Sequence, residues 1–196
     1  MKKDENKRWS EYANRTKGGN PRPLLVEALD YVKEKTAALD LGSGALNDAK
    51  FLIESGFVMT TALDAIRAPE EIVESVPRER FAYVNETFRE YAFPEDSFDL
   101  INAQYSLPFI QPADFANIFP KIEKALKPGG IFVGNFFGDR DEWSDNPEMT
   151  FLTKKEAKEV FVSWDLIKFE EVEEKKKTAK GCLKQWHLFN VITQKK

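Results

Sequence analysis

Two glycines and two aspartates are the residues whose types and spacing suggest chemistry. Gly42 and Gly44 form a G-x-G turn in the stretch LDLGSGALND, and Asp40 precedes that turn. Asp64 lies 20 residues beyond Gly44, at the end of the next apolar run. A glycine-rich turn between a strand and a helix lets a ligand approach the backbone closely, and nucleotides are the usual ligands. These residues therefore predict a nucleotide site.

The two aspartates indicate which nucleotide. The dinucleotide fingerprint G-x-G-x-x-G needs a third glycine where this chain has Asn47. A carboxylate at Asp40 would repel a pyrophosphate but attract a cation, such as the ammonium group of S-adenosylmethionine. Neighbouring strand ends lie about 5 Å apart, so Asp64 can reach the hydroxyls of an unphosphorylated ribose. A cap or turn role is the alternative for each aspartate, and for Asp40 alone both remain open.

Other kinds of active site find little support in the sequence. The single histidine, His187, lies in the apolar run KQWHLFNVIT, where a structural role is favoured over a catalytic one. One histidine and one cysteine, Cys182, do not make a typical zinc site, so no metal is expected. Cys182 is interpreted as inert, and the chain has no G-x-S-x-G nucleophile elbow.

Composition excludes several classes of partner. The chain of 196 residues has a net charge of -4, with 42% hydrophobic and 32% charged residues, as in an ordinary globular domain. An acidic balance does not favour nucleic-acid or membrane-surface binding. With one cysteine, no apolar run of membrane-spanning length and no signal-peptide pattern, a cytoplasmic protein is expected. The oligomeric state is left open.

Apolar periodicity divides most of the chain into alternating strands and helices. Such alternation predicts a doubly wound α/β sheet, and the two last strands, joined by the basic turn 175–180, predict an antiparallel C-terminal hairpin. The expected fold is a seven-stranded, mostly parallel sheet. Pro120 predicts a kink or break in its helix. The expected strands are 36–41, 57–64, 80–85, 97–107, 131–137, 164–174 and 181–194, and the expected helices are 23–35, 46–56, 68–77, 113–130 and 153–161.

With these motifs in place, the chain resembles a class I S-adenosylmethionine-dependent methyltransferase, from about residue 20 to the end. LDLGSGALNDAKFLIESGF is similar to the family's first motif, and TALDA to its second-strand acid. NETFREYAFPEDSFDLINAQYSLPF and IEKALKPGGIFVG resemble the segments through the fourth and fifth strands. Among its branches, the chain is most similar to the small tellurite-resistance-type and related small-molecule methyltransferases. One departure is Leu46, which stands where the family often has a third glycine and is expected to narrow the space near the methionine tail.

The resemblance implies roles in binding S-adenosylmethionine. Asp40 and the turn from Gly42 to Gly44 would hold the methionine part, and Asp64 the ribose. The remaining positions implied to contact the cofactor are Ser43 in the turn, Ala65, Ile66, Thr87 and Phe88 near the adenine, Ala103 and Gln104 near the sulfonium, and Tyr12, Arg15 and Arg22 from the N-terminal segment.

The acceptor pocket is expected beyond the fourth and fifth strands, in QYSLPF and FFGDRDEW. Gln104, Tyr105, Asp139 and Trp143 are the candidate catalytic residues. Aromatic faces there can hold a cationic or flat group, although Tyr105, Phe109 and Trp143 also suit simple loop packing. Asp139, Asp141 and Glu142 are either substrate-positioning acids or a solvated loop face.

The sequence thus predicts an enzyme that transfers a methyl group to a small-molecule acceptor. Residues 1–20 are expected to form an N-terminal arm or lid over a methyltransferase domain of residues 21–196. Two alternatives remain, namely a nicotinamide-dependent oxidoreductase of Rossmann type and a non-catalytic module that binds S-adenosylmethionine.

Overall fold

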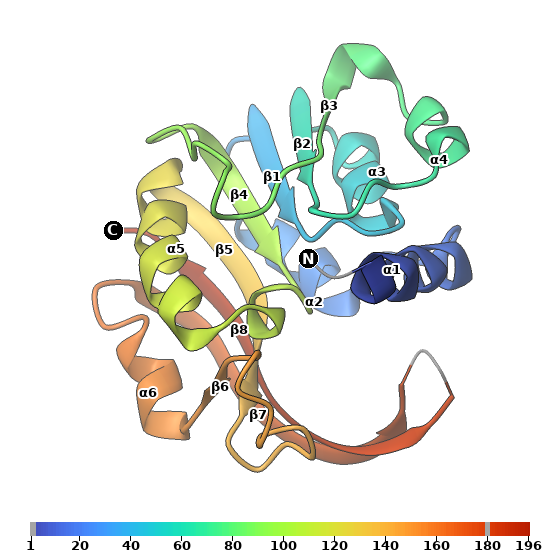
Figure 1. The fold of residues 1–196 in the computed structure, drawn as a ribbon. Helices are drawn as coiled ribbons and strands as arrows, with labels where there is room; N and C mark the ends of the chain where they lie inside the picture. The colour runs from blue at the N-terminus through green and yellow to red at the C-terminus, as the bar shows by residue number, and fades with distance from the viewer. Residues whose placement is uncertain (1–2, 179–180) are drawn as a thin grey trace.

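A single mixed sheet organises the computed structural model, which describes residues 3–178 and 181–196. The strand order is β3-β2-β1-β4-β5-β8-β7, with parallel pairing from β3 to β5 and antiparallel pairing of β5 with β8 and of β8 with β7 (Figure 1). A two-residue strand, β6, pairs with the end of β5. The strands are β1 (Ala37–Leu41), β2 (Met59–Leu63), β3 (Phe81–Val84), β4 (Phe98–Ala103), β5 (Leu126–Gly138), β6 (Phe151–Leu152), β7 (Asp165–Lys177) and β8 (Leu183–Gln194).

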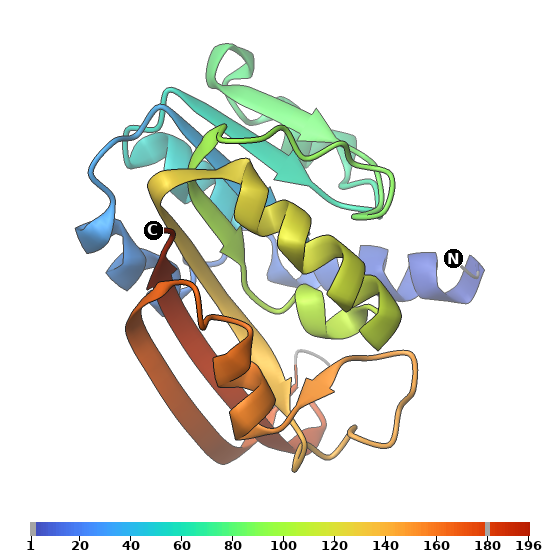
Figure 2. The same ribbon diagram turned by 90° about the vertical axis from the view of Figure 1, so that its left-hand side faces the viewer.

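Helices cover both faces of this sheet. Helix α5 lies across one face of the sheet (Figure 2). Its buried residues Phe115, Ile118, Phe119 and Ile122 have the spacing of one side of a helix and pack against the sheet. On the other face, apolar residues of α2 and α3 pack against β1, β4 and β5. The helices are α1 (Lys3–Thr16), α2 (Pro23–Ala28), α3 (Asn47–Glu54), α4 (Glu70–Glu74), α5 (Pro112–Ala125) and α6 (Lys154–Glu159), with short 3-10 turns at Leu29–Tyr31, Arg78–Arg80 and Leu107–Phe109.

The predicted fold class is confirmed, with four corrections in detail. Residues 126–130, predicted as the end of the helix 113–130, are instead the first residues of β5. The sheet gains an eighth strand, β6, which is too short for periodicity to reveal. Helix α5 continues through Pro120 instead of breaking, because Pro120 lies on the exposed side and the buried stripe holds the helix on the sheet. Lysines 175–177 extend β7 rather than forming the turn; residues 179–180 of the predicted turn lie outside the described residues.

The C-terminal hairpin reaches past the rest of the sheet. The pairing of β5 with β8 ends at Phe137 and Leu188, whereas β7 and β8 stay paired out to Lys177 and Leu183. In Figure 1 this end of the hairpin, in red, curves below the blue helix α1. The hairpin therefore brings β7 and β8 residues toward the same region as the N-terminal helix. Among the described residues, no helix is both long and apolar enough to cross a membrane.

Candidate active site

A cleft of about 1820 Å³ lies beyond the carboxyl ends of β1, β2 and β4, with α1 along one side. This is where open α/β sheets bind their ligands. Of the residues predicted from the sequence, fifteen line the cleft: Tyr12, Arg15, Arg22, Gly42, Ser43, Gly44, Asp64, Ala65, Ile66, Thr87, Phe88, Tyr105, Phe109, Glu142 and Trp143. Asp40, Ala103, Gln104 and Asp139 are not lining residues of this cleft.

The two glycines of the turn have different structural reasons to be glycine. Gly42 has a φ of 72°, and a Cβ at this position would lie 2.5 Å from Cβ of Ser106, so a side chain would collide with the loop after β4. Gly44 has a φ of 48°, but the nearest atom to an added Cβ is a backbone oxygen 3.9 Å away. The backbone at Gly44 is therefore open to a ligand, while Gly42 lets two parts of the protein meet.

Asp64 is fixed at the end of β2 by backbone donors. The amide of Gly44 donates to its Oδ2 and the amide of Ile66 donates to its Oδ1, both at 2.8 Å. Burial raises the pKa of Asp64, and these two hydrogen bonds oppose the shift by favouring the ionised form. A carboxylate held in this way presents its remaining lone pairs in a defined direction.

Leu46 does not narrow the cleft, contrary to the sequence-based expectation. Its side chain is fully buried in a cluster with Ala49, Ile53, Ala62 and Ile72, on the side of α3 away from the turn. Its backbone has a φ of 61°, a left-handed conformation that costs a non-glycine residue about 1–2 kcal/mol. A glycine would suit the backbone here, whereas leucine contributes apolar packing.

Asp40 belongs to a buried polar network behind the turn. Nδ2 of Asn102 donates to Oδ1 of Asp40 at 2.7 Å and lies 3.2 Å from Oδ2 of Asp48. Arg22 closes the network, donating from its guanidinium to Oδ2 of Asp48 at 2.7 Å and from its backbone amide to Oδ1 at 2.9 Å. Oδ2 of Asp40 has no hydrogen-bond partner among the described residues. Burial, with help from the carboxylate of Asp48, raises the pKa of Asp40 to about 7.

Gln104 and Ala103 are placed differently from the prediction. Gln104 is only 4% exposed, and its Nε2 donates to Oδ1 of Asn102 at 3.0 Å. Ala103 is fully buried at the end of β4. The side chain of Gln104, in the turn directly after β4, thus supports the network around Asp40 through Asn102 instead of lining the cleft.

Thr87 lines the cleft but already has a local partner. Its hydroxyl and its backbone amide both donate to Oε2 of Glu90, at 2.7 and 3.0 Å. A hydroxyl committed in this way has little hydrogen-bonding capacity left for the adenine, which the family resemblance places near Thr87. Phe88, the next residue, also lines the cleft.

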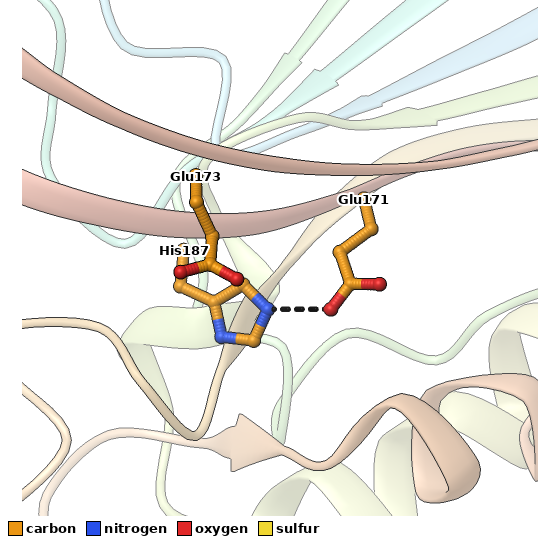
Figure 3. Close-up of side chains that lie close together, drawn as sticks. All are labelled: Glu171, Glu173 and His187. Carbon is orange, nitrogen blue, oxygen red and sulfur yellow. Dashed lines mark hydrogen bonds and ion pairs between the residues drawn. The ribbon is translucent and has the colours of Figure 1, made fainter.

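Asp139 lies outside the cleft, in an ion-pair network with His187. The ring of His187 is fully buried, accepts a hydrogen bond from the backbone amide of Arg140 at its Nδ1, and lies 3.1 Å from Oε1 of Glu171 at its Nε2 (Figure 3). Asp139 does not line the cleft because the chain, where β5 ends, turns toward His187 and its partners. A Cβ at Gly138 would lie 1.9 Å from the histidine ring, which gives His187 a packing role.

Glu171, Glu173 and His187 have the donor types of a metal site, and Figure 3 shows them converging. The guanidinium of Arg140 already lies among them, with Nη2 2.8 Å from Glu171, 2.5 Å from Glu173 and 3.2 Å from Nε2 of His187. Hydrogen bonds with Lys154, Arg140 and His187 lower the pKa of Glu171 to about 2, and Lys154 contributes most. The cluster is thus organised around an arginine side chain.

The solvated-loop interpretation of Asp141 is wrong. Asp141 forms a buried ion pair with Lys184, whose Nζ lies 2.5 and 2.6 Å from the two carboxylate oxygens. The same ammonium lies 4.0 Å from the ring centre of Trp143 and 3.6 Å from that of Trp186. Sequence reasoning missed Lys184 and Trp186. Lys184 and Trp186 lie on the last strand, whereas Asp141 and Trp143 lie in the loop after β5. No local pattern in the sequence signals that these four residues meet.

An aromatic chamber of about 300 Å³ opens beside the cleft. Tyr105, at its centre, has a φ of 51°, so the backbone after β4 adopts a conformation that bulky residues rarely take. The chamber shares seven lining residues with the cleft and adds five from the hairpin; its aromatic lining is Trp9, Tyr12, Tyr105, Phe109, Trp143 and Trp186.

Comparisons with known proteins agree with this architecture. Residues 39–134 match the profile of the family described as "Methyltransferase domain". A search of curated protein sequences found no significant match.

Solved structures share the fold at low sequence identity. The Burkholderia thailandensis 1,6-didemethyltoxoflavin-N1-methyltransferase, bound to 1,6-didemethyltoxoflavin and S-adenosylhomocysteine, has a TM-score of 0.70 and 20% identity over 98% of this chain and 82% of its own. TehB from Haemophilus influenzae has a TM-score of 0.70 and 17% identity over 88% of this chain and 61% of its own. The [4+2]-cyclase SpnF has a TM-score of 0.66 and 14% identity over 88% of this chain and 79% of its own, so the fold alone does not define one reaction.

The sheet order, the reversed last strand and the cleft at the strand ends define a Rossmann-like fold of the methyltransferase type. The segment 39–134, which carries the glycine turn, Asp64 and β4, is the part of the chain that matches the methyltransferase-domain family. The family match confirms the resemblance expected from the sequence.

Proposed function

We propose that this protein transfers the methyl group of S-adenosylmethionine to a small-molecule acceptor. The observation that carries the proposal is the junction of Gly44 and Asp64: an open glycine backbone and a fixed carboxylate meet at adjacent strand ends, inside the cleft of about 1820 Å³. The methyltransferase family match supports the same reaction.

The network behind the turn fits the methionine part of the cofactor. Oδ2 of Asp40 is a buried acceptor without a partner, and such an atom is costly unless a donor reaches it. The ammonium group of S-adenosylmethionine supplies such a donor, either directly or through a bridging water. Arg22, which lines the cleft beside this network, would pair with the carboxylate of the same ligand.

The other half of the cleft fits the nucleoside. Asp64 would accept hydrogen bonds from the two ribose hydroxyls, since its two backbone donors leave lone pairs free on each oxygen. Ala65 and Ile66 follow it along the cleft wall, with Thr87 and Phe88 on the neighbouring segment. We propose these four residues as the adenine side of the site.

When bound, the cofactor supplies an electrophilic methyl group on a positively charged sulfur. The residues of this chain would then act chiefly by alignment, because an in-line displacement depends on holding donor and acceptor at a near-attack distance. Tyr105 and Trp143 lie where the cleft meets the aromatic chamber, so we assign them to positioning the acceptor. A general base is needed only for an acceptor that must lose a proton.

Residues 1–20 would form a lid over this site. Helix α1 contributes Trp9, Tyr12 and Ala13 to the cleft, and the carbonyl of Thr16 at its end accepts a 2.7 Å hydrogen bond from Nδ2 of Asn47. Closing α1 over the ligand would exclude water from the reacting atoms.

Formation of S-adenosylhomocysteine tests the proposal. The full chain is incubated with S-adenosylmethionine and a panel of thiol, amine, phenol and heteroaromatic acceptors, and the product is quantified by mass spectrometry. Acceptor-dependent product that falls in the Asp64→Ala variant supports methyl transfer. Nicotinamide reduction with no methylated product would favour the oxidoreductase, and cofactor binding without any turnover would favour the non-catalytic module.

A further inference from the structure

We propose that the aromatic chamber is the acceptor site and that it takes a flat aromatic or heteroaromatic molecule that is neutral or negatively charged. This assignment rests on the proposed methyltransferase function, which it makes more specific. The chamber has about 300 Å³, at the lower end of the range for small-molecule sites, and opens into the proposed cofactor cleft.

The walls of the chamber come from distant parts of the chain. Trp9 and Tyr12 belong to α1, Tyr105 and Phe109 follow β4, Trp143 lies in the loop after β5, and Trp186 belongs to β8. A chamber with six aromatic side chains offers flat, apolar surface to a ring system and little to a hydrated ion, which would lose its water on entry.

The rings meet at steep angles instead of stacking on one another. Trp9 and Phe109 have centres 4.9 Å apart at 79°, Tyr105 and Trp186 lie 6.3 Å apart at 86°, and Trp143 and Trp186 lie 5.6 Å apart at 61°. In each of these pairs the two rings do not lie face to face. A flat ligand can therefore stack on a wall of the chamber without displacing an internal stack.

Cations of the protein itself already occupy the aromatic surface. Lys184 lies 3.6 Å from the ring centre of Trp186, held there by Asp141, and the guanidinium of Arg22 lies 5.4 Å from the ring centre of Tyr105. An acceptor cation would have to compete with these built-in cation–π contacts. A positively charged acceptor is therefore disfavoured.

The charged residues that line the chamber also disfavour a cationic acceptor. Arg22, Lys176 and Lys177 line the chamber with one acid, Glu174. Arg22 pairs with Asp48 at 2.7 Å and Lys176 with Glu174 at 3.3 Å, so Lys177 provides the remaining charge of the described lining. One uncompensated lysine at the rim favours an anion, such as an ionised ring nitrogen or oxygen.

An acceptor that is already ionised can be methylated without a general base. Its lone pair forms the new bond to the methyl carbon while the carbon–sulfur bond breaks, and the electron pair of that bond stays on sulfur, which loses its positive charge. The acceptor anion becomes neutral, and no proton has to be taken up by a protein group.

Three probes test the charge and shape of the ligand. Lumazine is a flat, ionisable bicyclic heteroaromatic, phenyltrimethylammonium is a flat cation, and selenite is a small oxyanion. Each is titrated by calorimetry into the full chain with saturating S-adenosylhomocysteine. We expect lumazine to bind at least about tenfold more tightly than the other two. Tighter binding of phenyltrimethylammonium or of selenite would overturn the assignment.

Two pairs of variants locate the binding site. Trp186→Leu should weaken lumazine about tenfold, whereas Trp186→Phe should keep most of the affinity because a ring remains. Lys177→Glu should weaken it about fivefold, whereas Lys155→Glu, the same charge change on exposed helix α6, should not. Equal affinity in all four variants would place lumazine elsewhere and refute the chamber. Trp9→Leu on α1 replaces Trp186→Leu if that variant fails to fold.

The same titrations separate this proposal from the one on which it rests. If S-adenosylhomocysteine binds but no flat probe does, the acceptor class is wrong and the methyltransferase function stands. If S-adenosylhomocysteine itself does not bind to the folded protein, the proposed function fails, whatever the chamber does.

Discussion

The amide nitrogen of Gly44 lies 2.8 Å from Oδ2 of Asp64, so the turn after β1 is tied directly to the end of β2. The other carboxylate oxygen accepts from the amide of Ile66 at the same distance. Two backbone donors therefore fix the orientation of one acid at the point where the cleft meets the open glycine. Such a preorganised acceptor suits a ligand that brings two hydroxyl groups.

Asp40 should make stability depend on pH. Its pKa rises from 3.8 to about 7 on folding, so between these values the folded protein holds a proton that the unfolded chain releases. The free energy of unfolding should fall as pH rises through this window, by on the order of 1.4 kcal/mol per pH unit, and level off above about pH 7. Asp40→Asn removes this dependence, as urea unfolding at about pH 5 and about pH 8 would measure.

A matched control for this prediction is Asp139→Asn, at a half-exposed carboxylate outside the network. It should show the pH dependence of the unchanged protein. If Asp40→Asn loses stability with rising pH as steeply as the unchanged protein, Asp40 is not the buried group that titrates.

Cofactor affinity should follow the opposite trend from stability. An ammonium group binds the ionised form of Asp40, so the affinity for S-adenosylhomocysteine should increase as pH rises from about 5.5 toward 7.5. The Asp40→Asn variant should show a flatter profile in calorimetry. A steep increase that persists in the variant would assign the pH dependence to another group.

Leu46 should affect folding and leave ligand binding unchanged. Leu46→Ala creates a cavity and keeps the left-handed backbone, at a cost of about 2–5 kcal/mol. Leu46→Gly loses the same packing but relaxes the backbone at a φ of 61°, so it should be about 1 kcal/mol more stable than Leu46→Ala. Urea unfolding compares the stability of the two variants. A change in the cofactor affinity of Leu46→Gly would show that the side chain of Leu46 does affect the binding site.

Local patterns explain why so much of the fold could be predicted. Alternation of apolar runs located every long strand, and the positions of Gly42, Gly44 and Asp64 follow from the strand ends on which they lie. Thr153 and Glu156 form a capping box at the start of α6, a motif that the sequence signals locally because it depends on residues three positions apart.

The misplaced residues depend on contacts that the sequence does not encode locally. Gln104 turns toward Asn102, and Asp139 leaves the cleft because the chain after β5 follows the buried ring of His187. Asp141 and Lys184 are 43 residues apart, and the antiparallel pairing of β5 with β8 brings the segments that carry them together. Strand spacing predicts which face a residue occupies; it does not predict which distant partner meets it.

Helix α1 should respond to the cofactor. Because Trp9 and Tyr12 line the cleft, ligand binding should add contacts to this helix and slow its local opening. Amide hydrogen exchange over residues 5–20 should be slower with S-adenosylhomocysteine than without it. Helix α6, which contributes no residue to the cleft, is the internal control, and equal exchange of α1 in both states would contradict a lid.

His187 should matter for stability and not for turnover. His187→Gln removes the ring that fills the space over Gly138 and should cost about 1–3 kcal/mol of stability, with a kcat within about threefold of the unchanged protein. Tyr105→Leu and Trp143→Leu should instead lower kcat by a factor of about 10 to 100 through lost alignment. A thousandfold loss of kcat in folded His187→Gln would make this histidine a reacting group.

The most direct test of the account is calorimetric titration of S-adenosylhomocysteine and, separately, NAD into the unchanged chain, Asp64→Ala and Asp139→Ala. The account predicts that S-adenosylhomocysteine binds the unchanged chain and Asp139→Ala equally, that Asp64→Ala weakens it by about 1.5–3 kcal/mol, and that NAD binds poorly to all three. Tight NAD binding, or an affinity for S-adenosylhomocysteine that is the same in folded Asp64→Ala, would contradict it.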